Sequence, residues 1–184
     1  MRFIIPVLVI LMVLFATGCG GNPHVVIVTN KGEIELELYA DTAPKHVENF
    51  LKLTDERFYV GTYFHRVVPG FVIQGGDPNS KDDDRYNDGT GGPGYTIEAE
   101  INLPHKRGSL AAARQGDRVN PEKRSSGSQF YICLEDLAQL DRGGYTVFGQ
   151  VVRGMDVVDR IAAVKRDARD NPINPVIMEQ VYAK

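Results

Sequence analysis

The stretch FHRVVPGFVIQGGD, residues 64–77, is the most informative part of the sequence. Gly and Pro separate two apolar runs, 64–68 and 71–74, and this pattern predicts two short strands joined by a turn. If both runs are strands, some of Arg66, Phe71 and Gln74 could share one wall of a sheet. The alternative is an arginine whose stem is buried and whose head reaches water at the rim of a barrel. The pattern alone leaves both interpretations open.

The segments on either side of this stretch predict a β-rich fold. Residues 25–28 and 34–38 flank Asn30-Lys31-Gly32, and the second run alternates apolar and acidic side chains, as in a half-buried hairpin strand. Asp41 or Thr42 as a cap, with Pro44 in the first turn, indicates the start of a helix. Many short strands and two short helices favour a closed or nearly closed antiparallel barrel. Further strands are expected at 129–134, 145–152 and 176–182, and a second helix at 155–163.

Composition restricts the class of protein. The chain has 184 residues, of which 42% are hydrophobic and 24% charged, so it is long enough for one domain and too apolar to be disordered throughout. Its formal net charge is −3, from 21 basic and 24 acidic residues. A general electrostatic grip on DNA or RNA needs an excess of positive charge. We therefore expect no nucleic-acid partner, and we expect a monomer.

The first residues have the layout of a secretory signal. Arg2 supplies a positive charge, residues 3–16 are apolar, and Ala16-Thr17-Gly18-Cys19 follows. The apolar run is shorter than the roughly 20 residues that a membrane-spanning helix needs. Small residues before a cysteine resemble a bacterial lipobox, so we expect a signal peptide over 1–18, lipid on Cys19, a tether over 19–24 and a folded domain over 25–184. The alternatives are an ordinary signal peptide and an uncleaved anchor.

The signal-like segment and the cysteine after it predict an extracytoplasmic lipoprotein that is anchored to the membrane on its periplasmic side. Gly20, and not Asp, follows the cysteine. In enterobacterial sorting, this residue would favour the outer membrane. We therefore expect the outer membrane if the cell has two.

Other chemistries are less well supported by the residues. Asp82-Asp83-Asp84 lacks the spacing of an EF-hand loop and is interpreted as a solvated loop. Residues 89–94 are rich in glycine but lack the Lys-Ser/Thr ending of a phosphate-binding loop. The serines do not form a Gly-x-Ser-x-Gly elbow, which argues against a hydrolase. The four histidines lack metal-ligand spacing, so no metal is expected. Cys133 lies in an apolar run and is interpreted as a small buried hydrophobe.

Four blocks in order along the chain carry a resemblance to a known family. Residues 64–77, 89–92, 127–132 and 147–149 closely resemble the motifs of cyclophilin-type peptidyl-prolyl cis-trans isomerases. The resemblance extends from about residue 25 to 182. It implies a mainly β fold, a closed eight-stranded antiparallel barrel capped by two short helices, with a substrate groove on its outer surface. It also implies an enzyme that isomerises X-Pro bonds of polypeptides without a cofactor and assists folding of extracytoplasmic proteins.

The resemblance implies a role for individual residues. Arg66 matches the catalytic arginine, and Gln74 matches the glutamine that binds the substrate backbone beside it. The substrate contacts implied by the resemblance are Phe71, Val72, Gly89, Ala113, Arg114, Gln129, Tyr131, Leu140 and Tyr145. A different class of function remains open, namely a peptide-binding or chaperone-like lipoprotein that uses the same groove with little turnover.

Several positions depart from the common family pattern. Gln139 stands where cyclosporin-sensitive members carry Trp, so weak cyclosporin binding is expected. The loop 115–126 is longer than in compact animal members, and its contacts cannot be transferred. The other departures are Val72 for Met, Arg114 for Asn, Tyr131 for Phe and Tyr145 for His.

Overall fold

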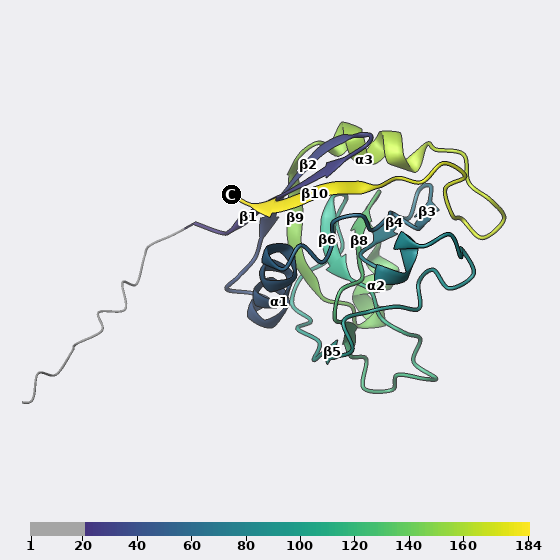
Figure 1. Ribbon diagram of the computed structural model, residues 1–184. Coiled ribbons are helices and arrows are strands. Elements are labelled where there is room, and N and C mark those ends of the chain that lie inside the picture. Colours follow the sequence, from purple (N-terminus) through teal and green to yellow (C-terminus); the bar gives the residue numbers. More distant parts are fainter. Residues whose placement is uncertain (1–20) are drawn as a thin grey trace, which may run out of the picture.

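The computed structural model describes residues 21–184, and most of its strands belong to one curled antiparallel sheet (Figure 1). The strands are β1 (His24–Thr29), β2 (Gly32–Leu38), β3 (Arg66–Val68), β4 (Val72–Gly75), β6 (Ser109–Ala112), β8 (Phe130–Cys133), β9 (Val147–Arg153) and β10 (Met178–Ala183). Their order in the sheet is β10-β1-β2-β9-β6-β8-β4-β3. Two further strands, β5 (Thr96–Ile97) and β7 (Ser125–Ser126), form a separate pair. The strands expected from the sequence are thus found, each within a few residues of its predicted bounds.

The sheet is an open half-barrel, so the closed barrel expected from the sequence is wrong. β3 and β10 are its two end strands, and they are not paired with each other. The segment before β3 reaches the start of β10 through an isolated bridge, Tyr63 to Ile177, and through single backbone hydrogen bonds, such as that from the Met178 N–H to the Thr62 carbonyl at 2.9 Å. β3 has three residues, and its free edge is occupied by a loop, since the Val67 N–H donates to the Asp170 carbonyl at 2.8 Å. The loop around Asp170 therefore takes the place that a closing ladder would need.

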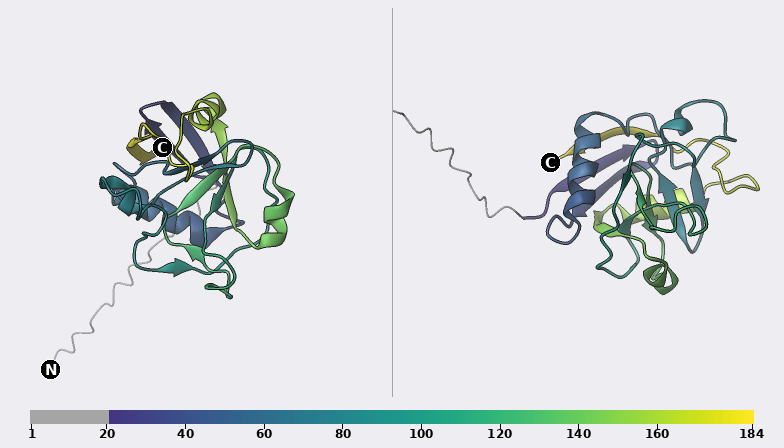
Figure 2. Two further views of the ribbon diagram at one scale, coloured as in Figure 1. Left: turned by 90° about the vertical axis from the view of Figure 1, so that its right-hand side faces the viewer. Right: turned by 90° about the horizontal axis from the view of Figure 1, so that it is seen from below.

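Three α-helices occur among the described residues, where the sequence predicts two. α1 (Pro44–Asp55) and α3 (Met155–Ala162) are the predicted helices, and Figures 1 and 2 show them well apart on the curled sheet. α2 (Ala138–Gly143) was not expected, because it is a single short segment with no buried residue and hence no apolar face to detect. The predicted cap of α1 is also wrong. Ala43 holds the cap position, and its side chain makes no hydrogen bond there.

Both faces of the strands β4, β6 and β8 are covered by apolar side chains. Because side chains alternate along a strand, Ile73 and Ile132 point into the main core, whereas Val72 and Tyr131 join a second, smaller apolar cluster outside it. α1 packs on the inner side through Phe50, whose ring lies 5.5 Å from that of Phe130. The outer cluster is the surface on which the candidate site is built.

In the described part of the chain, no helix combines the length and hydropathy that a membrane span requires. Cys19 and the predicted signal segment lie outside residues 21–184, so the structure does not test them.

Candidate active site

The site is organised around one arginine and one glutamine on neighbouring strands. Arg66 on β3 pairs directly with Gln74 on β4, so the two side chains lie on the same face of the sheet. The Arg66 Nη1 donates to Oε1 of Gln74 at 3.3 Å. The guanidinium carbon lies 6.0 Å from the centroid of the Phe71 ring, within the range of a cation–π contact. The interpretation in which Arg66, Phe71 and Gln74 share one wall is therefore confirmed.

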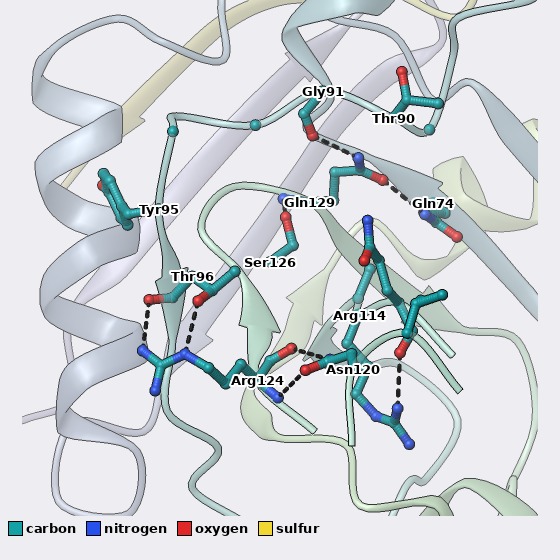
Figure 3. Close-up of a pocket in the computed structure, with 16 residues that line it drawn as sticks. Gln74, Thr90, Gly91, Tyr95, Thr96, Arg114, Asn120, Arg124, Ser126 and Gln129 are labelled. Carbon is teal, nitrogen blue, oxygen red and sulfur yellow. Dashed lines mark hydrogen bonds between the residues drawn. The ribbon is translucent and has the colours of Figure 1, made fainter. Parts of the chain in front are cut away.

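A chain of amides fixes the orientation of Gln74. Its Nε2 donates to Oε1 of Gln129 at 3.0 Å, and the Gln129 Nε2 donates to the Gly91 carbonyl at 2.8 Å (Figure 3). Each amide thus has one defined orientation, with Gln74 presenting its oxygen to Arg66. An arginine has five N–H donors, and within residues 21–184 Arg66 makes no ion pair. The remaining donors stay free for another acceptor.

An apolar cavity of about 130 Å³ opens beside Arg66. Cavities of about 150 Å³ lined by apolar side chains hold a ring the size of benzene, so this one fits a single small ring. Tyr131 from β8 and Leu140 from α2 form much of its lining, which explains why the unpredicted α2 matters. The lining residues are Arg66, Phe71, Val72, Gln74, Ala113, Arg114, Tyr131, Leu140 and Tyr145. The structure thus gathers nine of the eleven predicted catalytic and substrate-binding residues at one cavity.

The other two predicted residues, Gly89 and Gln129, line a larger neighbouring cavity of about 680 Å³ (Figure 3). Gln74, Ala113 and Arg114 line both cavities. The long loop 115–126 forms one wall of the larger cavity. Its Arg124 donates through Nε to the Thr96 hydroxyl at 2.7 Å, and its backbone N–H donates to Asn120 at 3.1 Å. This loop therefore forms a defined wall beside the site.

Sequence reasoning missed a buried polar chain behind the apolar cavity. The Tyr131 hydroxyl lies 2.9 Å from Nε2 of His105, and Nδ1 of His105 lies 2.8 Å from Oδ1 of Asp141 on α2. The His105 side chain is fully buried. The pKa of Asp141 is lowered, first by the hydrogen bond from the His105 backbone N–H and then by that from the His105 side chain. The chain ties α2 to the strand that carries Tyr131. The tyrosine at position 131, within an apolar run, was the one available sign, because a buried hydroxyl needs a partner.

Arg114 is held over the ring of Tyr145, with its guanidinium carbon 4.5 Å from the ring centroid. It also pairs with Asp117 at 2.7 Å, which fixes it against the start of the long loop. The pKa of Asp117 is lowered, first by its hydrogen bond with Arg114. Arg114 therefore separates the two cavities as a fixed wall.

Two predictions about the other chemistries can be compared with the structure. Cys133 is buried, and burial raises the pKa of its thiol to about 12, so it is no nucleophile at neutral pH. The prediction of a buried hydrophobe is confirmed. Asp82, Asp83 and Asp84 are exposed, and no cluster of three or more metal-ligating side chains occurs among the residues that the structure describes.

Comparisons with known proteins agree on one family. Residues 24–183 match the family model described as cyclophilin type peptidyl-prolyl cis-trans isomerase/CLD. A peptidyl-prolyl cis-trans isomerase of Helicobacter pylori is 46% identical over 143 residues, which cover 75% of this chain and 79% of the relative. Peptidyl-prolyl cis-trans isomerase A of Dickeya dadantii is 39% identical over 166 residues, 86% and 83% of the two chains.

Solved structures give the same result. The crystal structure of a cyclophilin type isomerase of Cryptosporidium parvum superimposes with a TM-score of 0.79 at 32% identity. The match covers 89% of this chain and 98% of that one. A second crystal structure of that protein, in the presence of the dipeptide Ala-Pro, has a TM-score of 0.77.

Proposed function

The chain belongs to the cyclophilin-type peptidyl-prolyl cis-trans isomerases and catalyses rotation about X-Pro bonds, and we propose that Arg66 is its catalytic residue. A peptide bond resists rotation with a barrier of about 18–20 kcal/mol because resonance gives the C–N bond double-bond character. Rotation breaks that resonance and localises a lone pair on the prolyl nitrogen. A positive donor near that nitrogen stabilises the twisted amide more than the planar one, which lowers the barrier.

The placement of Arg66 is the observation that carries the proposal. Its guanidinium keeps its charge at all relevant pH values and still has free N–H donors. Arg66 lines a cavity that fits one small ring, with Gln74 hydrogen-bonded to it and the Phe71 ring in cation–π contact with it. A proline ring in the cavity would bring its nitrogen towards the guanidinium, while the acyl side rotates. No proton transfer or covalent step is required.

We assign the remaining contacts by their place around Arg66. Phe71, Val72, Leu140 and Tyr131 hold the prolyl ring by burial, and Gln74 binds the substrate backbone. The larger cavity, with Gly89 and Gln129 in its lining, would receive the residues that precede the proline. The alternative is a groove that binds peptides with little turnover, and one measurement distinguishes it from an active isomerase. Proline-isomerase kinetics on the chain without residues 1–18 should show turnover well above the uncatalysed rate, whereas binding without acceleration would support the alternative.

We further propose that the enzyme works outside the cytoplasm as a lipoprotein. The support is the sequence pattern around Cys19. Slow X-Pro isomerisation limits folding over tens to hundreds of seconds, and an extracytoplasmic space has no ATP for chaperones. A tethered isomerase there would act on newly exported chains.

Replacement of Cys19 by Ser tests the anchor. We expect wild-type protein in the membrane fraction and the Cys19→Ser protein in the soluble extracytoplasmic fraction, because stable anchoring needs more than one acyl chain and all would be lost. The matched control is Cys133→Ser, which keeps the N-terminal cysteine. If mass spectrometry detects no lipid on the wild-type protein, the proposal is wrong.

Weak inhibition by cyclosporin is the second expectation. Gln139 lies on α2 where drug-sensitive relatives carry a tryptophan, whose indole N–H and ring face contribute to drug binding. We expect Gln139→Trp to restore part of the inhibition, measured as the concentration that halves turnover. Wild-type inhibition at nanomolar concentration would show that this position does not control drug binding.

A further inference from the structure

A third cavity, of about 280 Å³, lies on the other side of the catalytic pair. Arg66 and Gln74 line it as well as the apolar cavity, so the two cavities share one wall. Its other walls come from two loops, one with Arg85 and Asp88, the other with Arg169. The roles proposed above for the enzyme leave this cavity without a ligand.

Contacts between the two loops give the cavity a fixed shape. The Arg85 Nη2 donates to the carbonyl of Ile173 at 2.8 Å, and Nδ2 of Asn171 donates to Oδ2 of Asp88. The guanidinium carbon of Arg169 lies 4.8 Å from the centroid of the Tyr86 ring. The second loop is itself tied to the edge of β3 through Asp170. The cavity is therefore a built part of the fold.

Three arginines line this cavity, and none of them has a carboxylate partner within ion-pair distance in the described part of the chain. Among residues 21–184, most other arginines outside the long loop 115–126 form ion pairs, for example Arg107 with Asp159 at 2.8 Å. Arg66, Arg85 and Arg169 form none. Arginines that line one cavity and have no carboxylate partner favour an anion there, above all a carboxylate that accepts two parallel N–H bonds.

The acidic groups nearby leave this preference in place. Asp88 is the one carboxylate in the lining; its Oδ2 accepts from Asn171, and it forms no ion pair with Arg66, Arg85 or Arg169. Asp167 beside the second loop accepts from the backbone N–H groups of Arg169 and Asn171. His65 is buried at the inner wall, and burial lowers its pKa to about 4, so it is neutral and adds no charge. With three arginines and one carboxylate, the lining of this cavity has a net positive formal charge.

We infer that this cavity binds the carboxylate of an Asp or Glu side chain that flanks the proline in the substrate. The shared wall makes this geometry natural, because a polypeptide with its proline ring on one side of Arg66 passes within reach of the other side. Arg85 and Arg169 would then act as specificity-determining residues, and Arg66 would remain free to act on the X-Pro bond. The substrate class would be acidic segments around X-Pro bonds.

Matched peptides test the inference on the chain without residues 1–18. In each pair, Glu or Gln occupies one position before or after the proline, and kcat/KM is measured for both. At the favoured position we expect the wild-type enzyme to prefer Glu about fivefold, the size of a partly exposed charge-assisted bond. The preference should shrink as ionic strength rises, because salt screens exposed charges.

Two variants connect the preference to the cavity. In Arg85→Gln/Arg169→Gln, the Glu-to-Gln ratio should fall to about one, and in Arg169→Glu a Lys peptide should overtake its Glu counterpart. The control Arg153→Gln/Arg160→Gln removes the same charge from residues that line none of these cavities, and should keep the ratio. A wild-type ratio of one at every position, or a ratio equal in the double variant and the control, would overturn the inference. Turnover of the Gln peptides is a separate readout from the Glu-to-Gln ratio. Neither of these results would therefore bear on the catalytic role of Arg66.

Discussion

Replacement of Arg66 by Ala should reduce kcat/KM for a proline peptide by about 10²–10³. The Arg66 guanidinium lines the apolar cavity without a carboxylate partner among residues 21–184, whereas Arg114, the other arginine of the lining, is paired with Asp117. Gln74 and Phe71 fix Arg66 before substrate arrives. Loss of one such donor typically removes about 2.7–4 kcal/mol of transition-state stabilisation. Peptide affinity should fall less than turnover, because the apolar lining of the cavity remains. Isomerase kinetics and binding measured separately on the same protein check both statements.

Arg66→Lys should also be impaired, since an ammonium is a point charge and cannot reproduce the planar fork of donors. Arg160→Ala is the matched control, because it removes an exposed arginine of α3 whose partner is Asp156. All three proteins should give wild-type circular dichroism, because Arg66 is half-buried at the surface of the sheet and is not part of the main core. A folded Arg66→Ala enzyme with wild-type turnover would show that the arginine is structural.

The sequence predicts the elements that form the main core well, because their apolar residues recur at regular spacing. The hairpin of β1 and β2, the helix α1 and the helix α3 all repeat apolar residues at strand or helix spacing, and the structure buries those residues in one core. Closure of the barrel was mispredicted for a different reason. Closure depends on which segment hydrogen-bonds to the edge of β3. In this chain the loop at Asp170 bonds to that edge, and β10 does not pair with it. Such competition between distant segments leaves no local pattern.

The site was predictable to the extent that motifs mark it. Residues 64–77 contain both members of the pair Arg66 and Gln74, and their register places them together. The polar residues behind the apolar cavity were not predicted. In the sequence, His105 and Asp141 are isolated polar residues, and no local pattern indicates that they form a hydrogen bond. These two residues are 36 positions apart in the chain, and they meet because α2 packs beside the strand that carries Tyr131. The third cavity was missed for the same reason, since its three arginines come from β3 and from two separate loops.

Asp77, the last residue of the opening motif, shows how a fully buried charge can hold part of the site in place. Its side chain is completely buried and accepts three backbone N–H bonds. Oδ1 accepts from Asn79 at 2.8 Å, and Oδ2 accepts from Gly89 and Gly91. The carbonyl of Gly91 in turn accepts from Gln129, which orients Gln74. The carboxylate therefore fixes the far end of the amide chain that leads to Arg66.

Asp77→Ala should therefore lower both stability and activity. A buried donor left without an acceptor costs about 1–3 kcal/mol, so the loss of three bonds should reduce the free energy of unfolding by about 3 kcal/mol or more, measured by urea denaturation. kcat/KM should fall in the protein that remains folded, because Gly91 no longer holds Gln129 in place. Asp83→Ala is the control: it removes the same charge from an exposed position in the same segment, and it should change the free energy of unfolding by less than about 0.5 kcal/mol. Equal stability of the two variants would mean that water replaces the carboxylate at no cost, and that the loop does not depend on Asp77.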